Sequence, residues 1–246
     1  MREADSYRNA CAHALREHDR DLFLCALAAP GAVRDGLTAL YAFNAEITRA
    51  AETSSEALIA QMRLKWWYDA LDAIFDGNPP HHPVAQALAE AAAGGLDKAV
   101  LRGVIEALAD ADDLDGGEYD PERQRLRADA TLVPVFGQAL RLAGAAGRGA
   151  EDAVQAAARA WGLVSTLRRA PVPPAHVPAL HAEALVQRRR AGRPKGKAAP
   201  VLAPVVLADI YLARIAKAGF DLGHPLARRA DPGAMALPRL WWAARF

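Results

Sequence analysis

The sequence is poor in cysteine, in net charge and in long apolar runs. Its two cysteines, Cys11 and Cys25, are too few for a disulfide framework, so a reducing compartment fits best. The formal net charge of +1 predicts no general binding of nucleic acid. No apolar run reaches the roughly 18 to 20 residues that span a bilayer, and residues 1–5 carry acids in place of an apolar signal segment. We therefore expect a cytoplasmic protein whose membrane contact, if any, is peripheral.

What the chain does contain is helical patterning along most of its length. Hydrophobic residues make up 52% of the 246 residues and charged residues 24%, as in an ordinary globular protein. Apolar residues recur at helical spacing, and Pro and Gly mark the breaks, as in Gly77-Asn78-Pro79-Pro80 before a helix that opens at Pro83. We predict a single all-α domain over residues 1–246.

The composition changes in one place, a basic segment near residues 187–199. The run from Val186 to Lys197 holds six cations and no acid, and its Gly and Pro residues disfavour a stable helix. We expect a mobile, solvated loop. The alternative is contact with an acidic partner or with an anionic membrane surface.

Several further segments have recognisable patterns. The aromatic tail from Leu237 to Phe246 either docks on the core or, in a second interpretation, anchors at a membrane interface. Other expectations are an apolar helix over 200–217, a capping box at 53–56, a helix over about 97–114 and an acidic, solvated loop at 110–115.

The helix predicted for residues 37–52 has an unusual polar end. The segment is rich in Ala and Leu, contains no Gly or Pro, and should be largely buried. Yet it ends in Thr48-Arg49-Ala50-Ala51-Glu52. Because buried helices are normally lined with apolar groups, this end calls for a specific explanation.

This helix and the next one resemble the squalene/phytoene synthase family. The resemblance rests on Tyr41-Ala42-Phe43, on Trp66-Trp67, and on the Gly-Asn-Pro-Pro break with its restart at His82-Pro83-Val84. It implies an all-α, isoprenoid (terpenoid) synthase-type helical bundle around a central cavity. By this resemblance the family's aspartates fall on Thr48, Arg49 and Glu52 in a first motif and on Arg169 and Pro173 in a second, a family Asn falls on Ser165, and a family Tyr falls on Arg127.

In the family those carboxylates hold magnesium ions against a prenyl diphosphate. Here only Glu52 remains, and Arg49 and Arg169 should repel divalent cations. We expect no catalytic residue, metal site or cofactor, with magnesium needed only if the chain is an active prenyltransferase. The resemblance gives a candidate anion or prenyl-diphosphate pocket of Tyr41, Asn44, Thr48, Arg49, Glu52, Ser165, Arg168 and Arg169. In the alternative interpretation the arginines pair with Glu46, Glu52 or carbonyl groups, the usual fate of a half-buried Arg.

These departures are themselves similar to a non-catalytic branch of the family that serves in the assembly of respiratory complex I, the NADH dehydrogenase. The resemblance implies a catalytically deficient assembly or binding factor, peripheral on the inner membrane, with complex I subunits or assembly intermediates as partners. Two alternatives stay open. One is a prenyl transferase that condenses two farnesyl or geranylgeranyl diphosphates at a rebuilt site, and the other is a carrier of prenyl diphosphate or lipid.

Overall fold

The computed structural model describes residues 2–52, 57–110, 119–145 and 147–245, and in these ranges it contains helices and no strand. Short 3-10 turns lie at Pro174–His176 and Gly196–Ala198. The α-helices are α1 Arg2–His18, α2 Arg20–Ala28, α3 Gly31–Glu52, α4 Ala57–Phe75, α5 Pro83–Ala92, α6 Lys98–Ala109, α7 Pro121–Leu142, α8 Arg148–Arg169, α9 Val177–Ala191, α10 Ala199–Leu202, α11 Pro204–Lys217, α12 Pro225–Arg228 and α13 Ala236–Ala243. The all-α prediction is confirmed.

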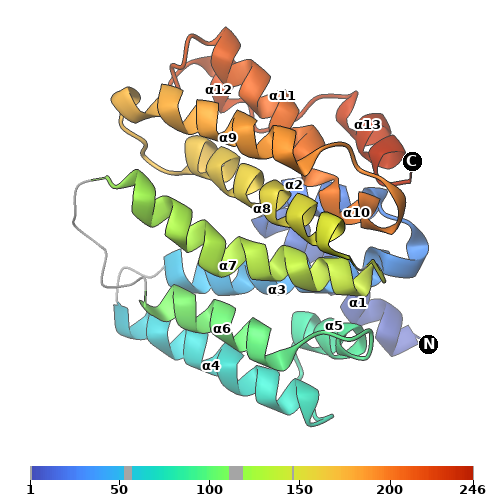
Figure 1. Cartoon of the computed structure of the whole chain (residues 1–246). Helices are drawn as coiled ribbons and strands as arrows, with labels where there is room; N and C mark the ends of the chain where they lie inside the picture. Colours follow the sequence, from blue (N-terminus) through green and yellow to red (C-terminus); the bar gives the residue numbers. More distant parts are fainter. Residues whose placement is uncertain (1, 53–56, 111–118, 146, 246) are drawn as a thin grey trace.

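Helix α3 runs through the middle of the bundle (Figure 1). It packs against α1, α2, α4, α5, α6 and α7, while α8 packs against α7 on one side and α9, α10 and α11 on the other. Leu37, Leu40, Phe43 and Ile47 of α3 are fully buried, as the sequence predicts for this helix. The Phe43 ring meets the edge of Trp67 from α4, with ring centroids 5.4 Å apart. Together with the buried apolar residues of the other helices, these side chains form one apolar core.

Aspartates start three of the helices by capping. The carboxylates of Asp19, Asp97 and Asp120 accept hydrogen bonds from backbone amides in the first turns of α2, α6 and α7, which satisfies donors that have no partner within the helix. Pro121 follows at the first position of α7, where its missing N–H costs nothing. The break that the sequence indicates at residues 77–80 lies where expected, since α4 ends at Phe75 and α5 begins at Pro83.

Two boundaries differ from the sequence predictions. Residues 187–191 are helical, as the last turn of α9, so the expected loop over 187–199 is wrong in its first part. There the helix-forming Arg188, Arg189 and Arg190 continue α9 until Gly192, whose φ of 66° ends it. The apolar helix predicted over 200–217 is divided at Ala203, where α10 and α11 meet at an angle of 44°.

Some predicted features lie outside the described residues. These are the capping box at 53–56 and most of the acidic loop at 110–115, together with the end of the helix expected to reach residue 114. Within the described ranges, no single helix has the length and apolar character to cross a membrane, although the bent pair formed by residues 196–202 and 204–217 passes such a test jointly.

Candidate functional site

The side of α3 that carries Tyr41, Asn44, Thr48 and Glu52 begins in the core and ends at the surface. Tyr41 and Asn44 are 0% and 6% exposed, and neither the Tyr41 hydroxyl nor Asn44 Oδ1 has a hydrogen-bond partner among the described residues. Burial raises the pKa of the Tyr41 phenol, with a smaller contribution from Cys25, so the hydroxyl stays neutral. One turn further Thr48 is half-buried, and Glu52 is exposed. This face presents neutral polar groups inside and one carboxylate at the rim.

That carboxylate is engaged by a cation from α7. Arg127 Nη2 donates to Glu52 Oε1 at 3.1 Å, which links the C-terminal end of α3 to α7. The resemblance places Arg127 where the family has a Tyr, so the replacement on α7 contacts the one acid that remains at the first-motif positions of α3.

Arg49 extends toward α1 instead of toward α8. Its Nη1 lies 3.0 Å from His18 Nε2, and the same His18 nitrogen lies 3.6 Å from Glu46 Oε1. Because a guanidinium can only donate, this contact requires a lone pair on His18 Nε2. Arg49 is therefore part of a contact between α1 and α3.

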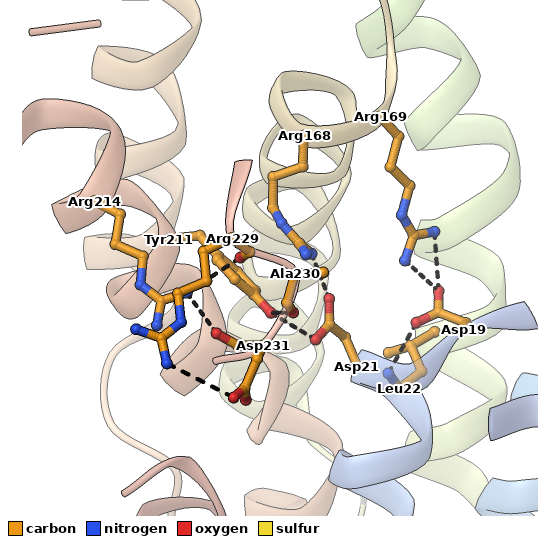
Figure 2. Close-up of polar contacts among 10 residues, drawn as sticks. All are labelled: Asp19, Asp21, Leu22, Arg168, Arg169, Tyr211, Arg214, Arg229, Ala230 and Asp231. Carbon is orange, nitrogen blue, oxygen red and sulfur yellow. Dashed lines mark hydrogen bonds and ion pairs between the residues drawn. The ribbon is translucent and has the colours of Figure 1, made fainter. Parts of the chain in front are cut away.

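On α8, the helix of the second motif, Arg168 is held in a buried cluster with residues of α2 and α11 (Figure 2). Arg168 Nη1 donates to Asp21 Oδ2, and the Tyr211 hydroxyl donates to Asp21 Oδ1 at 2.7 Å. The guanidinium also lies over the Tyr211 ring, 3.6 Å from its centroid. The Arg168 and Asp21 side chains are only 11% and 4% exposed. Both oxygens of the carboxylate are thus satisfied and its charge is neutralised.

The neighbouring Arg169 makes a similar bridge nearer the surface. Its Nη1 and Nη2 both lie 3.2 Å from Asp19 Oδ2, and Asp19 Oδ1 accepts the amide of Leu22 at 3.0 Å. Burial alone would lower the pKa of Arg169, but Asp19, with smaller help from Asp21 and Glu52, raises it overall. Ser165 is half-buried one turn before this pair.

Pairing of the arginines was one of the two interpretations of the sequence, but most of the partners differ from those expected. Arg49 contacts His18, while the partners of Arg168 and Arg169 are Asp21 and Asp19. The sequence shows Asp19 as a helix start; it gives no sign that α2 lies against the end of α8, 147 to 150 residues away.

The residues present do not fit magnesium. In the described part of the chain, no three His, Cys, Asp or Glu side chains are placed to hold one ion. The acid at a first-motif position is paired with Arg127, and the two acids nearest the second motif are paired with Arg168 and Arg169. A divalent ion here would have to displace guanidinium groups from Glu52, Asp21 and Asp19.

Two hollows in the surface lie away from the residues of the candidate pocket. One, of about 210 Å³, lies between α7, α8 and α9 and is lined in part by Arg125, Asp129 and Arg159. The other, of about 490 Å³, is open and lies between α11 and α13. Between α7 and α8 the packing is tight: a Cβ added at Gly162 would lie 2.8 Å from the Cβ of Ala128. Neither hollow is lined by a residue of the candidate pocket.

The family model for squalene/phytoene synthase matches residues 15–173, from the end of α1 to just beyond the paired arginines. The chain belongs to the squalene/phytoene synthase family. The match covers α3 and α8, so residues 48, 49 and 169 all lie within the part of the chain that matches the family.

Solved members of the family share the fold. The structure superimposes on a dehydrosqualene synthase with a TM-score of 0.78 over 99% of this chain and 96% of that one, at 12% identity. For a squalene synthase from Alicyclobacillus acidocaldarius the TM-score is 0.66, over 89% of this chain and 97% of that one, at 16% identity. These likenesses confirm the isoprenoid synthase-type fold, and at such identity they show the fold alone.

The relatives that are similar in sequence are named as assembly factors of complex I and not as synthases. NADH dehydrogenase (ubiquinone) complex I, assembly factor 6, from Rattus norvegicus is 31% identical over 163 residues, which is 65% of this chain and 48% of that protein. The Bos taurus protein matches to the same extent, and the Drosophila melanogaster homolog is 37% identical over 67 residues. The chain spans about half the length of the mammalian relatives.

Proposed function

We propose that this protein is a non-catalytic member of its family that acts as an assembly or binding factor, with respiratory complex I as its target. The names of the relatives support the target. The proposed loss of catalysis rests on the pairing of Arg168 and Arg169 with Asp21 and Asp19. This pairing lies at the end of α8, where the family resemblance places metal-binding carboxylates.

The chemistry explains why this pairing opposes a prenyl transfer. Departure of a diphosphate leaves an allylic cation, and divalent metal stabilises the departing charge. Arginines could in principle bind diphosphate directly, but Arg168 is 11% exposed and its charge is already neutralised by Asp21. Freeing it would leave a buried carboxylate without its partner, which costs several kcal/mol. The ion pair between Arg168 and Asp21 therefore serves to hold α8 against α2.

We also propose that the protein works in the cytoplasm and at the inner membrane as a peripheral protein, with complex I subunits or assembly intermediates as partners. Because Arg168 and Arg169 are engaged by Asp21 and Asp19, a partner is expected to bind elsewhere on the surface of the bundle. Such a role needs no cofactor and no turnover.

The test is deletion of the gene in its source organism, followed by complementation. We expect the deletion to reduce fully assembled complex I on native gels and NADH:quinone activity in membranes. Wild-type protein should restore both, and so should Glu52→Gln, which removes the only acid at a first-motif position. A tagged copy should capture complex I subunits from solubilised membranes.

Unchanged complex I in the deletion strain would refute the assembly role. If Glu52→Gln folds normally but fails to restore the complex, the proposal that the motif carboxylate is dispensable would be wrong.

A further inference from the structure

The C-terminal helix α13 turns a row of large apolar side chains outward. Ala236 and Leu240 are 2% and 0% exposed and attach the helix to α2, α10 and α11. On the other side Leu237, Trp241 and Trp242 are 44%, 49% and 63% exposed, and Met235 just before the helix is 64% exposed. Docking on the core is therefore confirmed for one face of α13, while the other face is turned outward.

A group of cations lies in the last turn of α9 and in the connection that follows it to α10. Arg189, Arg190, Arg193, Lys195 and Lys197 are all exposed, and none forms an ion pair within the described ranges. Arg188, by contrast, is paired through both Nε and Nη2 with Asp209 at 2.8 Å and donates to the Gly192 carbonyl at 2.7 Å. The segment is thus held at its start while its remaining charges point into solvent.

The aromatic helix and the cations border each other. Asp209, the partner of Arg188, lines the same open hollow as Arg239 and Trp242. Helix α10, which directly follows the cationic connection, packs against α13. Figure 1 shows α13 and the connection from α9 to α10 at the same end of the molecule. The surface formed by residues 189–197 and 235–242 is here called the basic aromatic surface.

We propose that the basic aromatic surface docks the protein on an anionic lipid bilayer. Indole rings favour the interface between headgroups and acyl chains, and each nearby Lys or Arg adds roughly fivefold in affinity for an anionic membrane. Neither part is sufficient alone, because α13 has only eight residues and cations alone give weak, salt-sensitive binding. Together they supply the two signals that stable peripheral binding needs.

The geometry favours a bilayer over a protein helix as the occupant. Trp242 lines the open hollow between α11 and α13 together with the charged Asp209 and Arg239. Leu237 and Trp241 project from α13 with the cations beside them, which suits an anionic lipid surface better than an apolar partner helix. The chain offers a contrasting surface on α4, where Leu58 and Met62 are 67% and 64% exposed but lie far in sequence from this cationic segment. That surface serves as a matched apolar control. The proposed docking does not depend on the assembly role.

The experiment is flotation of the full chain with vesicles. One set contains phosphatidylcholine alone and the other about one part phosphatidylglycerol to three parts phosphatidylcholine. We expect binding to the anionic vesicles only, weakened at least tenfold by 0.5 M NaCl. The triple variant Arg189→Gln/Arg190→Gln/Arg193→Gln should bind on the order of 100-fold more weakly. Trp241→Ser/Trp242→Ser should lose at least tenfold.

The control Leu58→Ser/Met62→Ser removes two apolar side chains that are at least as exposed and should bind like wild type. Circular dichroism and melting temperature verify the fold of each variant. The proposal would be overturned by equal binding to neutral and anionic vesicles, by no binding to either, or by equal losses in the control. Binding to polyglutamate that survives removal of both tryptophans and exceeds binding to vesicles would identify an acidic protein as the partner and would also overturn it.

Discussion

Replacing Arg168 by Met is the sharpest test of the paired rim. Met fills a similar volume but leaves Asp21 without its guanidinium in a site where that carboxylate is 4% exposed. Removing one member of a buried pair typically costs about 3–5 kcal/mol, because the remaining charge is desolvated and unpaired. The Tyr211 hydroxyl still donates to Asp21 Oδ1, so we expect the lower end, about 3 kcal/mol in the free energy of unfolding.

Arg169 provides the internal comparison. Its side chain is 48% exposed, and Asp19, though only 10% exposed, still accepts the Leu22 amide, so Arg169→Met should cost less, about 1 to 2 kcal/mol. The assay is urea unfolding followed by circular dichroism, with m-values compared between variants. In an Asp21→Asn background the cost of Arg168→Met should fall by at least about 2 kcal/mol, as a double-mutant cycle reports. A loss below about 1 kcal/mol for Arg168→Met, or no dependence on Asp21, would refute the reasoning.

Four other outcomes follow from the same structure. Tyr41→Phe removes a buried hydroxyl that has no described partner, so it should leave stability unchanged or raise it by up to about 1 kcal/mol in urea unfolding; a loss above about 1 kcal/mol would reveal a bound group at this position. Gly162→Val should destabilise by about 2 kcal/mol or more in the same assay, since even a Cβ would meet Ala128 at 2.8 Å, and a neutral effect would contradict the close packing of α7 on α8. Burial raises the pKa of Cys11 to about 12, so its thiol should react with a disulfide reagent at pH 8 only after unfolding; rapid reaction of the native protein would be inconsistent with that site. Burial lowers the pKa of His82, partly opposed by Glu46, so the unfolded chain takes up the proton first and stability should fall as the pH drops below about 6.5; His82→Gln should show a shallower loss, and an identical pH profile would argue against the assignment.

Much of the fold was predictable because its signals are local. Helix α3 is predicted by its composition and by the spacing of its apolar residues. Pro83 and Asp120 mark helix starts because proline and capping aspartate act within a few residues of the chain. The same rules failed at residues 187–191, where three arginines with good helix propensity outweighed the Gly and Pro that follow.

The candidate site was predictable in its residue positions but not in its contacts. The family resemblance places Arg169 at an acid position and Arg168 beside it, yet the partners of both come from α2 and the residue before it, about 150 residues earlier. No periodicity or motif reports a contact of that separation. The roles of Asp21 and Tyr211, and the contact of Arg127 with Glu52, therefore became visible only once the helices were placed.

The role of the chain as a protein without prenyl-transfer chemistry can be measured directly. Purified protein is incubated with farnesyl or geranylgeranyl diphosphate and magnesium, and both released pyrophosphate and bound prenyl diphosphate are followed, with Glu52→Gln as the matched variant. We predict no magnesium-dependent pyrophosphate release from either protein. Magnesium-dependent release by the wild-type chain, lost in Glu52→Gln, would contradict the account, and tight binding without release would identify a carrier instead.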